Sequence, residues 1–163
     1  GTFCSTTKPN MTSFTTDENE LTLYLSKKLP GVLRGIYSSN ELMSSPRAMG
    51  WPDHLPHALI INTDSNNLPG KHWIVIYLSG QGEVMDSYGI LPPTSVQRWL
   101  NEQTQHWVSN PYLIQPPESD SCGQFCAYYL IRRSQSDSLC SVLADFTTDL
   151  YRNERLVMTH VKL

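Results

Sequence analysis

The chain has 163 residues, a formal net charge of -3, a sequence pI of about 5.9 and 39% hydrophobic residues. This length fits a single domain with its own hydrophobic core. The acidic balance argues against a strongly basic nucleic-acid surface, and the lack of any run of 18 or more apolar residues argues against a membrane span.

The beginning of the chain divides into an arm and a helix. Residues 1–14 are polar and lack a period, so they predict a flexible arm ahead of one domain at 15–163. A helix is predicted to begin near Thr15, which can form a capping box with Glu18, and to end at Pro30. Its apolar stripe consists of Leu21, Leu25 and Leu29.

The middle of the chain predicts a β-hairpin. A breaker-rich stretch from Tyr37 to Pro56 indicates a loop, and three β-type runs follow it. A polar loop ending at Gly70 separates the first run from the second, and Gly80 lies in the turn before the third. These runs cover residues 58–61, 72–78 and 83–88.

The second half of the chain is mainly helical in pattern. Thr94 can cap a helix, Tyr112 to Ile114 predict a short strand, and a buried helix follows from Cys122. The order of elements predicts an α+β fold, with a central, mostly antiparallel sheet flanked by helices. The apolar positions of the predicted helices are Val96, Trp99, Leu100 and Trp107, then Phe125, Cys126, Tyr129 and Leu130, and then Leu139, Val142, Leu143 and Phe146, with a last helix at 149–157.

The four cysteines do not follow a metal-binding pattern. Cys122 and Cys126 are spaced C-x3-C, and no second pair follows, so we predict neither a metal site nor another cofactor. With this spacing in a chain of this length, we expect free thiols in a reducing compartment.

Cys122 is the candidate nucleophile. A thiol attacks as the thiolate, and the partial positive charge of a helix N-terminus favours that form. The junction at Cys122 supplies this placement, and Gly123 would let a substrate backbone approach the sulfur. Taken alone, the same position suits a small buried residue at a helix start.

His72 and Asp86 are the candidate base and orienting acid. Of the five histidines, only His72 opens a β-type run. If the hairpin loop has three residues, Leu78 pairs with Gly82, and His72 and Asp86 become diagonal neighbours about 7 Å apart on one face. A slip of one residue would place them on opposite faces. A carboxylate bonded to the far nitrogen of the ring would fix its tautomer.

Gln115 is the candidate oxyanion donor. It lies seven residues before Cys122, and its amide could donate to a developing oxyanion beside the backbone N–H of Cys122. One such donor is worth about 3 kcal/mol in the transition state. Alone, Gln115 would be an ordinary polar residue. Together with His72, Asp86 and Cys122, it predicts a cysteine endopeptidase.

These motifs resemble the adenovirus-type (adenain-like) cysteine proteases, most closely those of Maverick/Polinton elements and adintoviruses. The order His, acid, Gln, Cys is that of their clan, which also contains the SUMO-deconjugating enzymes, whereas papain-like enzymes place Cys before His. The matching segments are residues 59–63, 68–77 and 85–89, Gln115 and residues 120–130, with weaker similarity at 31–37.

The resemblance implies an adenain/SUMO-protease-like domain and a role for each residue. His72 would be the general base, Asp86 the third member of the triad, Cys122 the nucleophile and Gln115 part of the oxyanion hole. Trp73 would line the approach to the cysteine, although a core position in the strand suits it equally well.

The resemblance also implies cleavage of viral or transposon-encoded structural precursors at Gly-containing sites during virion maturation. The enzyme would be intracellular, in the host cytoplasm or nucleus, or packaged in virions. The same residues would serve an isopeptidase acting on a ubiquitin-like or SUMO-type modifier. A third alternative is an inactive, capsid-associated interaction protein.

Two features depart from the adenovirus pattern. The acid is Asp86, where the mammalian adenovirus enzymes have Glu. No cysteine lies between Asp86 and Gln115, so an activating peptide, if one acts, would not be disulfide-linked in the adenovirus manner. We expect polypeptide substrates and a monomer, with neither nucleic acid nor a membrane as partner.

Overall fold

The computed structural model describes residues 12–44, 56–63, 72–136 and 138–163. Three predicted segments lie wholly or mostly outside the described residues: residues 1–11 of the predicted arm, residues 45–55 of the loop before Pro56, and residues 64–71 of the loop before His72. The elements are α1 (Thr12–Lys28), β1 (Leu33–Ser38), the 3₁₀ helix η1 (Leu42–Ser44), β2 (His57–Asn62), β3 (Trp73–Ser79), β4 (Gln81–Met85), α2 (Thr94–Gln103), β5 (Trp107–Ser109), α3 (Cys122–Ser134), α4 (Leu139–Leu143) and α5 (Leu150–His160).

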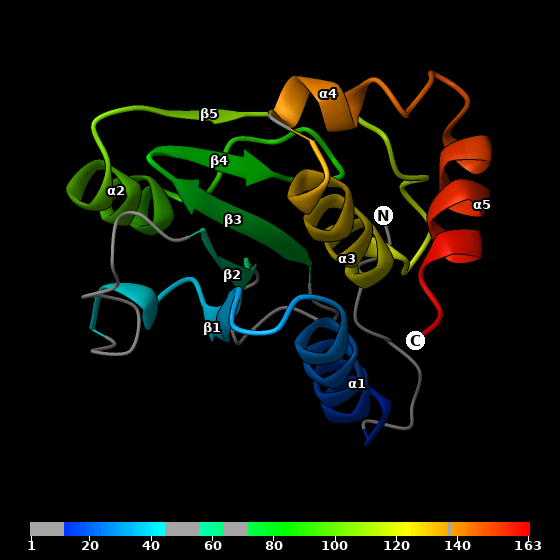
Figure 1. Ribbon diagram of the computed structural model, residues 1–163, viewed down its shortest axis with the longest axis horizontal. Coiled ribbons are helices and arrows are strands. Elements are labelled where there is room, and N and C mark those ends of the chain that lie inside the picture. Colours follow the sequence, from blue (N-terminus) through cyan, green and yellow to red (C-terminus); the bar gives the residue numbers. More distant parts are fainter. Residues whose placement is uncertain (1–11, 45–55, 64–71, 137) are drawn as a thin grey trace.

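The five strands form one mixed sheet in the order β1-β2-β3-β4-β5 (Figure 1). The two central pairings, β2–β3 and β3–β4, are antiparallel, whereas β1 pairs with β2 and β5 with β4 in parallel. The predicted α+β class, with a central sheet flanked by helices, is therefore confirmed, and the parallel pairings are confined to the two edge strands.

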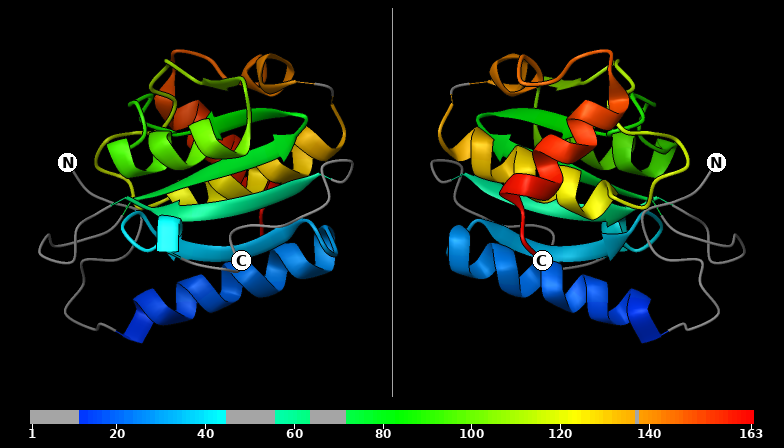
Figure 2. Two further views of the ribbon diagram at one scale, coloured as in Figure 1. Left: turned by 90° about the vertical axis from the view of Figure 1, so that its left-hand side faces the viewer. Right: turned by 90° about the vertical axis from the view of Figure 1, so that its right-hand side faces the viewer.

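Helices cover both faces of the sheet (Figure 2). Side chains alternate along β3, so Trp73 and Val75 pack against α1 and α3, while Ile74 and Ile76 pack against α2. Each of these four side chains is at most 2% exposed. Burying one large apolar side chain is worth about 1.5–3 kcal/mol. Because β3 contributes such side chains to the cores on both faces of the sheet, it joins the two cores.

The hairpin has the predicted register, with Leu78 opposite Gly82. The helix α1 begins at Thr12 rather than Thr15. The prediction that Trp107 extends α2 is wrong, because the helix ends at Gln103 and Trp107 begins β5.

The close approach of β5 to β4 depends on a glycine. A Cβ atom on Gly82 would lie 2.9 Å from the Cβ of Trp107. The predicted strand at Tyr112–Ile114 is also absent, because the backbone N–H of Ile114 donates to the carbonyl of Ser87 instead of joining a ladder. The strand β1 was not predicted.

A part-buried ion pair ties α3 to β4. Glu83 is 6% exposed and accepts from Nε and Nη2 of Arg133 at 2.9 and 3.0 Å. It also accepts from the hydroxyl of Tyr129, and the Arg133 guanidinium lies 4.7 Å above the Tyr77 ring. This cluster sets how α3 lies on the sheet.

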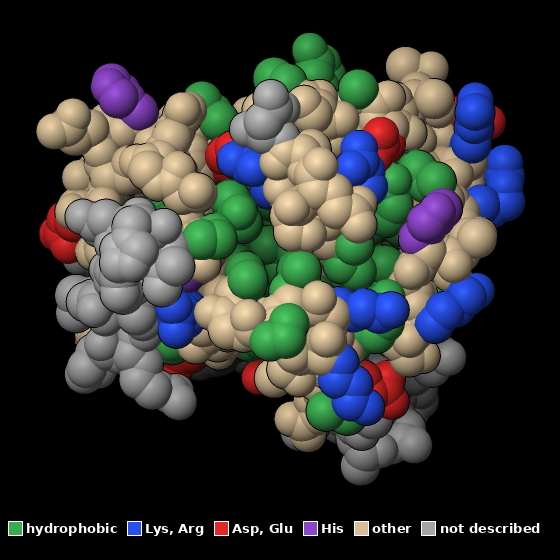
Figure 3. Space-filling model, in the orientation of Figure 1, with side chains coloured by type: hydrophobic (Ala, Val, Ile, Leu, Met, Phe, Trp, Pro, Cys, Tyr) green, Lys and Arg blue, Asp and Glu red, His purple; other side chains and the backbone are tan. Residues whose placement is uncertain are grey.

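The surface over α3 and α5 carries both basic and hydrophobic side chains (Figure 3). Lys and Arg side chains gather at the edge formed by α5, which contributes Arg152 and Arg155, while hydrophobic side chains show in the centre of this face. Among the described residues, no helix combines the length and apolar composition needed to cross a bilayer.

Candidate active site

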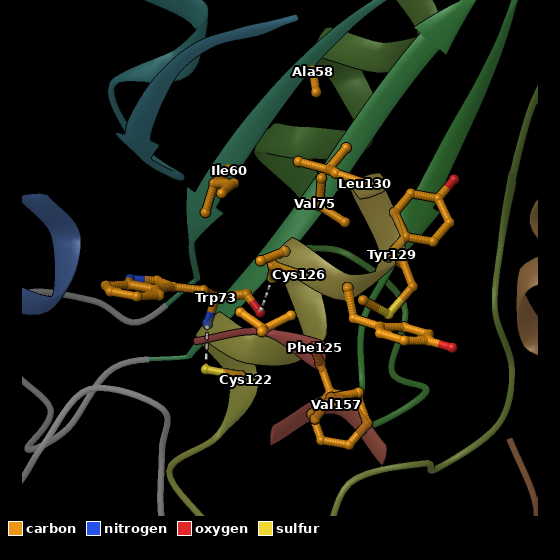
Figure 4. Close-up of a cluster of buried hydrophobic side chains, with 14 of the residues drawn as sticks. Ala58, Ile60, Trp73, Val75, Cys122, Phe125, Cys126, Tyr129, Leu130 and Val157 are labelled. Atoms are coloured by element: carbon orange, nitrogen blue, oxygen red, sulfur yellow. Dashed lines mark hydrogen bonds between the residues drawn. The ribbon is translucent and has the colours of Figure 1, made fainter. Parts of the chain in front are cut away.

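Cys122 is the first residue of α3, and its side chain is 0% exposed. The backbone N–H of Trp73 donates to the Cys122 sulfur at 3.4 Å, and the Cys126 thiol donates to the Trp73 carbonyl at 3.4 Å (Figure 4). Because residues i and i+4 share a helix face, the two sulfurs hold both polar backbone groups of Trp73. The sulfur of Cys122 thus lies against the residue that follows His72.

His72 and Asp86 meet at the same end of the sheet. Nε2 of His72 lies 2.6 Å from Oδ1 of Asp86, and the residues are 5% and 4% exposed. The same carboxylate oxygen accepts from the backbone N–H of Tyr88 at 2.8 Å. The Tyr88 ring stacks on the His72 ring at 4.4 Å between centroids and 20° between planes. The imidazole is therefore fixed at its edge and on its face.

The backbone of Asp86 is held by Asn110, a residue that sequence reasoning missed. Asn110 is 1% exposed. Its Oδ1 accepts from the Asp86 N–H at 2.7 Å, and its Nδ2 donates to the Asp86 carbonyl at 2.6 Å. Nδ2 also donates to the Tyr112 carbonyl at 3.1 Å. Asp86 lies 24 residues before Asn110 in the sequence, and no spacing pattern marks Asn110.

Gln115 is 0% exposed, and its contacts determine the orientation of its amide. Its nitrogen, Nε2, donates to the carbonyl of Ser119 at 3.0 Å, and its oxygen, Oε1, accepts from the hydroxyl of Ser87. A carbonyl can only accept a hydrogen bond, so the group facing Ser119 must be the NH₂. The donor end of Gln115 therefore points toward the loop that leads into Cys122.

That loop is anchored by α5. Ser119 Oγ contacts Ser121 Oγ at 2.6 Å and donates to the Glu154 carboxylate. The neighbouring Asn153 is 1% exposed, and its Nδ2 donates to the carbonyl of Ile114 at 3.0 Å. These side chains fix both ends of the segment from Ile114 to Ser121. Sequence reasoning missed the contacts of Asn153 and Glu154 with this segment, because each of them spans more than thirty residues.

The thiols differ in state. Cys126 and Cys140 are free, as expected, whereas Cys122 is disulfide-bonded, so the expectation of a free thiol is wrong for it in this structure. Burial raises the pKa of the Cys126 thiol above its ordinary value, and the charge of Asp86 raises it further. Cys126 is therefore a neutral hydrogen-bond donor, unsuited to nucleophilic attack.

Gly123 lies beneath the Trp73 ring. A Cβ atom on Gly123 would lie 3.1 Å from the ring atom Cζ3, so the helix start and the indole approach each other closely. Both residues are buried, Trp73 to 2% exposure. Their predicted contacts with substrate stay predictions, and the structure gives both a packing role. Among the described residues, no three His, Cys, Asp or Glu side chains gather to hold a metal ion.

Comparisons with known proteins point to viral cysteine proteases. No protein-family profile matches the chain. Over 104 residues the chain is 25% identical to the cysteine protease S273R of African swine fever virus, a match that covers 55% of this chain and 38% of that protease. The SUMO-1 cysteine protease S273R of another isolate is 24% identical, with the same coverage.

The solved structure of the ASFV pS273R protease aligns with a TM-score of 0.50 at 20% identity, covering 66% of this chain and 44% of that one. This likeness confirms the predicted fold. The sequence matches make the chain a low-identity homologue of viral cysteine proteases. It spans less than half the length of the curated relatives it matches.

Proposed function

We propose that this chain is a cysteine endopeptidase in which Cys122 is the nucleophile, His72 the base, Asp86 the orienting acid and Gln115 an oxyanion donor. One observation carries the proposal. The Cys122 sulfur lies 3.4 Å from the backbone nitrogen of Trp73, the residue that follows His72, and Nε2 of His72 is 2.6 Å from the Asp86 carboxylate. The similarity to viral cysteine proteases supports the same chemistry.

The acylation step follows from this arrangement. With Nε2 of His72 donating to Asp86, the other ring nitrogen accepts the thiol proton of Cys122. The thiolate, favoured by the N-terminus of α3, attacks the substrate carbonyl carbon and forms a C–S bond. The tetrahedral intermediate collapses when the C–N bond breaks, and the leaving amine takes the proton from His72.

Deacylation reverses these roles. His72 takes a proton from water, and the resulting hydroxide attacks the thioester carbonyl. The C–S bond then breaks, and Cys122 regains its proton from His72. The amide of Gln115 and the backbone N–H of Cys122 would stabilise the oxyanion in both steps, with each donor contributing about 3 kcal/mol.

The proposed mechanism requires Cys122 as a free thiol. Cys122 is disulfide-bonded in this structure, and a sulfur in a disulfide cannot provide the thiolate that attacks a carbonyl. A thiol reductant is therefore expected to switch activity on.

For substrates, we propose viral or transposon-encoded structural precursors cut at Gly-containing sites, in the manner of Maverick/Polinton and adintovirus proteases. The enzyme would work inside the host cell or within virions. The second candidate is an isopeptidase for a ubiquitin-like modifier. It is favoured by one observation, the SUMO-1 cysteine protease named among the relatives. Gly-Gly tails and Gly-containing precursor sites place the same steric demand on the site.

The test compares Cys122→Ala with Cys140→Ala, a matched control at a free, exposed thiol. With reductant present, wild type and Cys140→Ala should cleave Gly-containing precursor peptides, and Cys122→Ala should not. Equal cleavage by all three would refute the proposal. Gln115→Ala should lower kcat by roughly 100-fold or more.

Two probes separate the alternatives. Ubiquitin-like proteins with a C-terminal electrophile should label Cys122 strongly if the chain is an isopeptidase, without precursor cleavage. Iodoacetamide at pH 6 reports the thiolate of reduced Cys122. Alkylation as slow as that of an ordinary thiol, with a pKa near 8.5, would favour the inactive, capsid-associated alternative.

A further inference from the structure

A pocket of about 290 Å³ opens beside the candidate base. It is lined by the polar and aromatic residues Thr63, His72, Asp86 and Tyr88 and by the apolar residues Ile90, Leu91 and Pro93. At about 30 Å³ per water molecule, it has room for roughly ten waters, enough for one large side chain. Because His72 and Asp86 of the proposed triad line it, a substrate held at the triad would have part of its chain next to this pocket.

Two of the apolar residues that line the pocket are left exposed by the fold. Ile90 is 61% and Leu91 66% exposed, although both are large aliphatic residues. They lie between β4 and α2, in a segment that is hydrogen-bonded at both ends. The Gly89 N–H donates to the Asp86 carbonyl at 2.8 Å, and Nε2 of Gln97 donates to the Pro92 carbonyl at 2.8 Å. An apolar surface held open beside polar groups is typical of a ligand site.

The chemistry of acyl transfer determines which part of a substrate reaches this pocket. The acyl half binds at Cys122 and Gln115, since the sulfur bonds to the carbonyl carbon and the amide holds its oxygen. The leaving amine must contact His72 to receive its proton. The pocket is lined by His72 but by neither Cys122 nor Gln115. The chain that follows the scissile bond therefore passes the pocket.

We propose that this pocket is a specificity subsite for an apolar side chain just after the scissile bond of a polypeptide substrate. Ile90, Leu91 and Pro93 would contact that side chain, and the stacked ring of Tyr88 would form the base of the subsite. The inference rests on the proposed peptidase function and adds a preference on the leaving-group side, opposite the Gly-containing acyl side.

The test uses three peptides that share one acyl half and differ only in the residue after the scissile bond, which is Leu, Ser or Asp. A methyl ester of the same acyl half serves as a reference, because its leaving group carries no side chain. We expect kcat/KM to favour Leu over Asp by roughly tenfold or more. The double variant Ile90→Ser with Leu91→Ser should lose this preference and hydrolyse the ester within about twofold of wild type.

Leu23→Ser is the matched control, because Leu23 is 56% exposed on α1 and does not line the pocket. It should keep the wild-type preference. Equal kcat/KM for the three peptides, or an unchanged preference in the double variant, would overturn the subsite proposal. The peptidase proposal would still stand in that case, provided that the ester is hydrolysed. If the reduced wild type fails to hydrolyse even the ester, the peptidase proposal is refuted, and the subsite with it.

Discussion

Replacing Asn110 with Ala tests how the acid is held. The substitution leaves the Asp86 N–H without its 2.7 Å acceptor, whereas the Asp86 carbonyl keeps the N–H of Gly89 at 2.8 Å. One buried, unsatisfied donor costs about 1–3 kcal/mol, and one lost hydrogen bond adds about 1 kcal/mol. Tyr112 is 64% exposed, so water can replace the third bond. The free energy of unfolding should therefore fall by about 2–4 kcal/mol.

Urea unfolding followed by tryptophan fluorescence measures this loss. The control is Asn101→Ala, because Asn101 is exposed and its amide oxygen accepts one bond, from Trp107 Nε1 at 2.8 Å. That variant should lose at most about 1 kcal/mol. Equal unfolding free energies for the two variants would refute the view that Asn110 anchors the acid. Under the proposed mechanism, kcat/KM of Asn110→Ala should also fall at least about tenfold, because a misplaced Asp86 would orient His72 poorly.

Three further predictions concern other contacts. Ser87→Ala removes the hydroxyl that orients Gln115, so kcat should fall by roughly tenfold or more with a smaller change in KM, and equal kcat would contradict this role. Because burial raises the pKa of Cys126 above 9.0, the unfolded chain releases this proton first, so the free energy of unfolding should fall above pH 9 by about 1.4 kcal/mol per pH unit. Cys126→Ala should lessen that slope in pH-dependent urea titrations. Glu83→Ala leaves the part-buried Arg133 without its carboxylate and should cost about 2 kcal/mol in the same unfolding assay, between the values for exposed and buried pairs, whereas a loss under 1 kcal/mol would show that water replaces the pair.

The sequence allowed the hairpin to be predicted because its information is local. The turn around Gly80 sets the register, and the register then puts His72 and Asp86 on one face. The start of α3 at Cys122 is local as well, since Pro residues and a polar loop precede a helical apolar pattern. These features depend on neighbours within about fifteen residues.

The missed features depend on distant partners. Trp107 fits the apolar face of a helix by its spacing. It lies in a strand because it pairs with Gly82, whose missing side chain lets β5 approach β4 closely. The strand β1 pairs with β2, which begins about twenty residues after β1 ends. Asn110 and Asn153 act through backbone groups of other segments, and a backbone carbonyl leaves no signature in the side-chain sequence.

The anchoring of the Ile114–Ser121 segment by Asn153 and Glu154 has a consequence for synthesis on the ribosome. His72, Asp86 and Cys122 all leave the exit tunnel before α5 does. Until α5 docks, Ser119 lacks its carboxylate partner and Ile114 its amide. If the proposed roles hold, a nascent chain would thus carry Cys122 and His72 while the segment that holds Gln115 is not yet anchored, and neighbouring nascent polypeptides would be spared until α5 has emerged and docked.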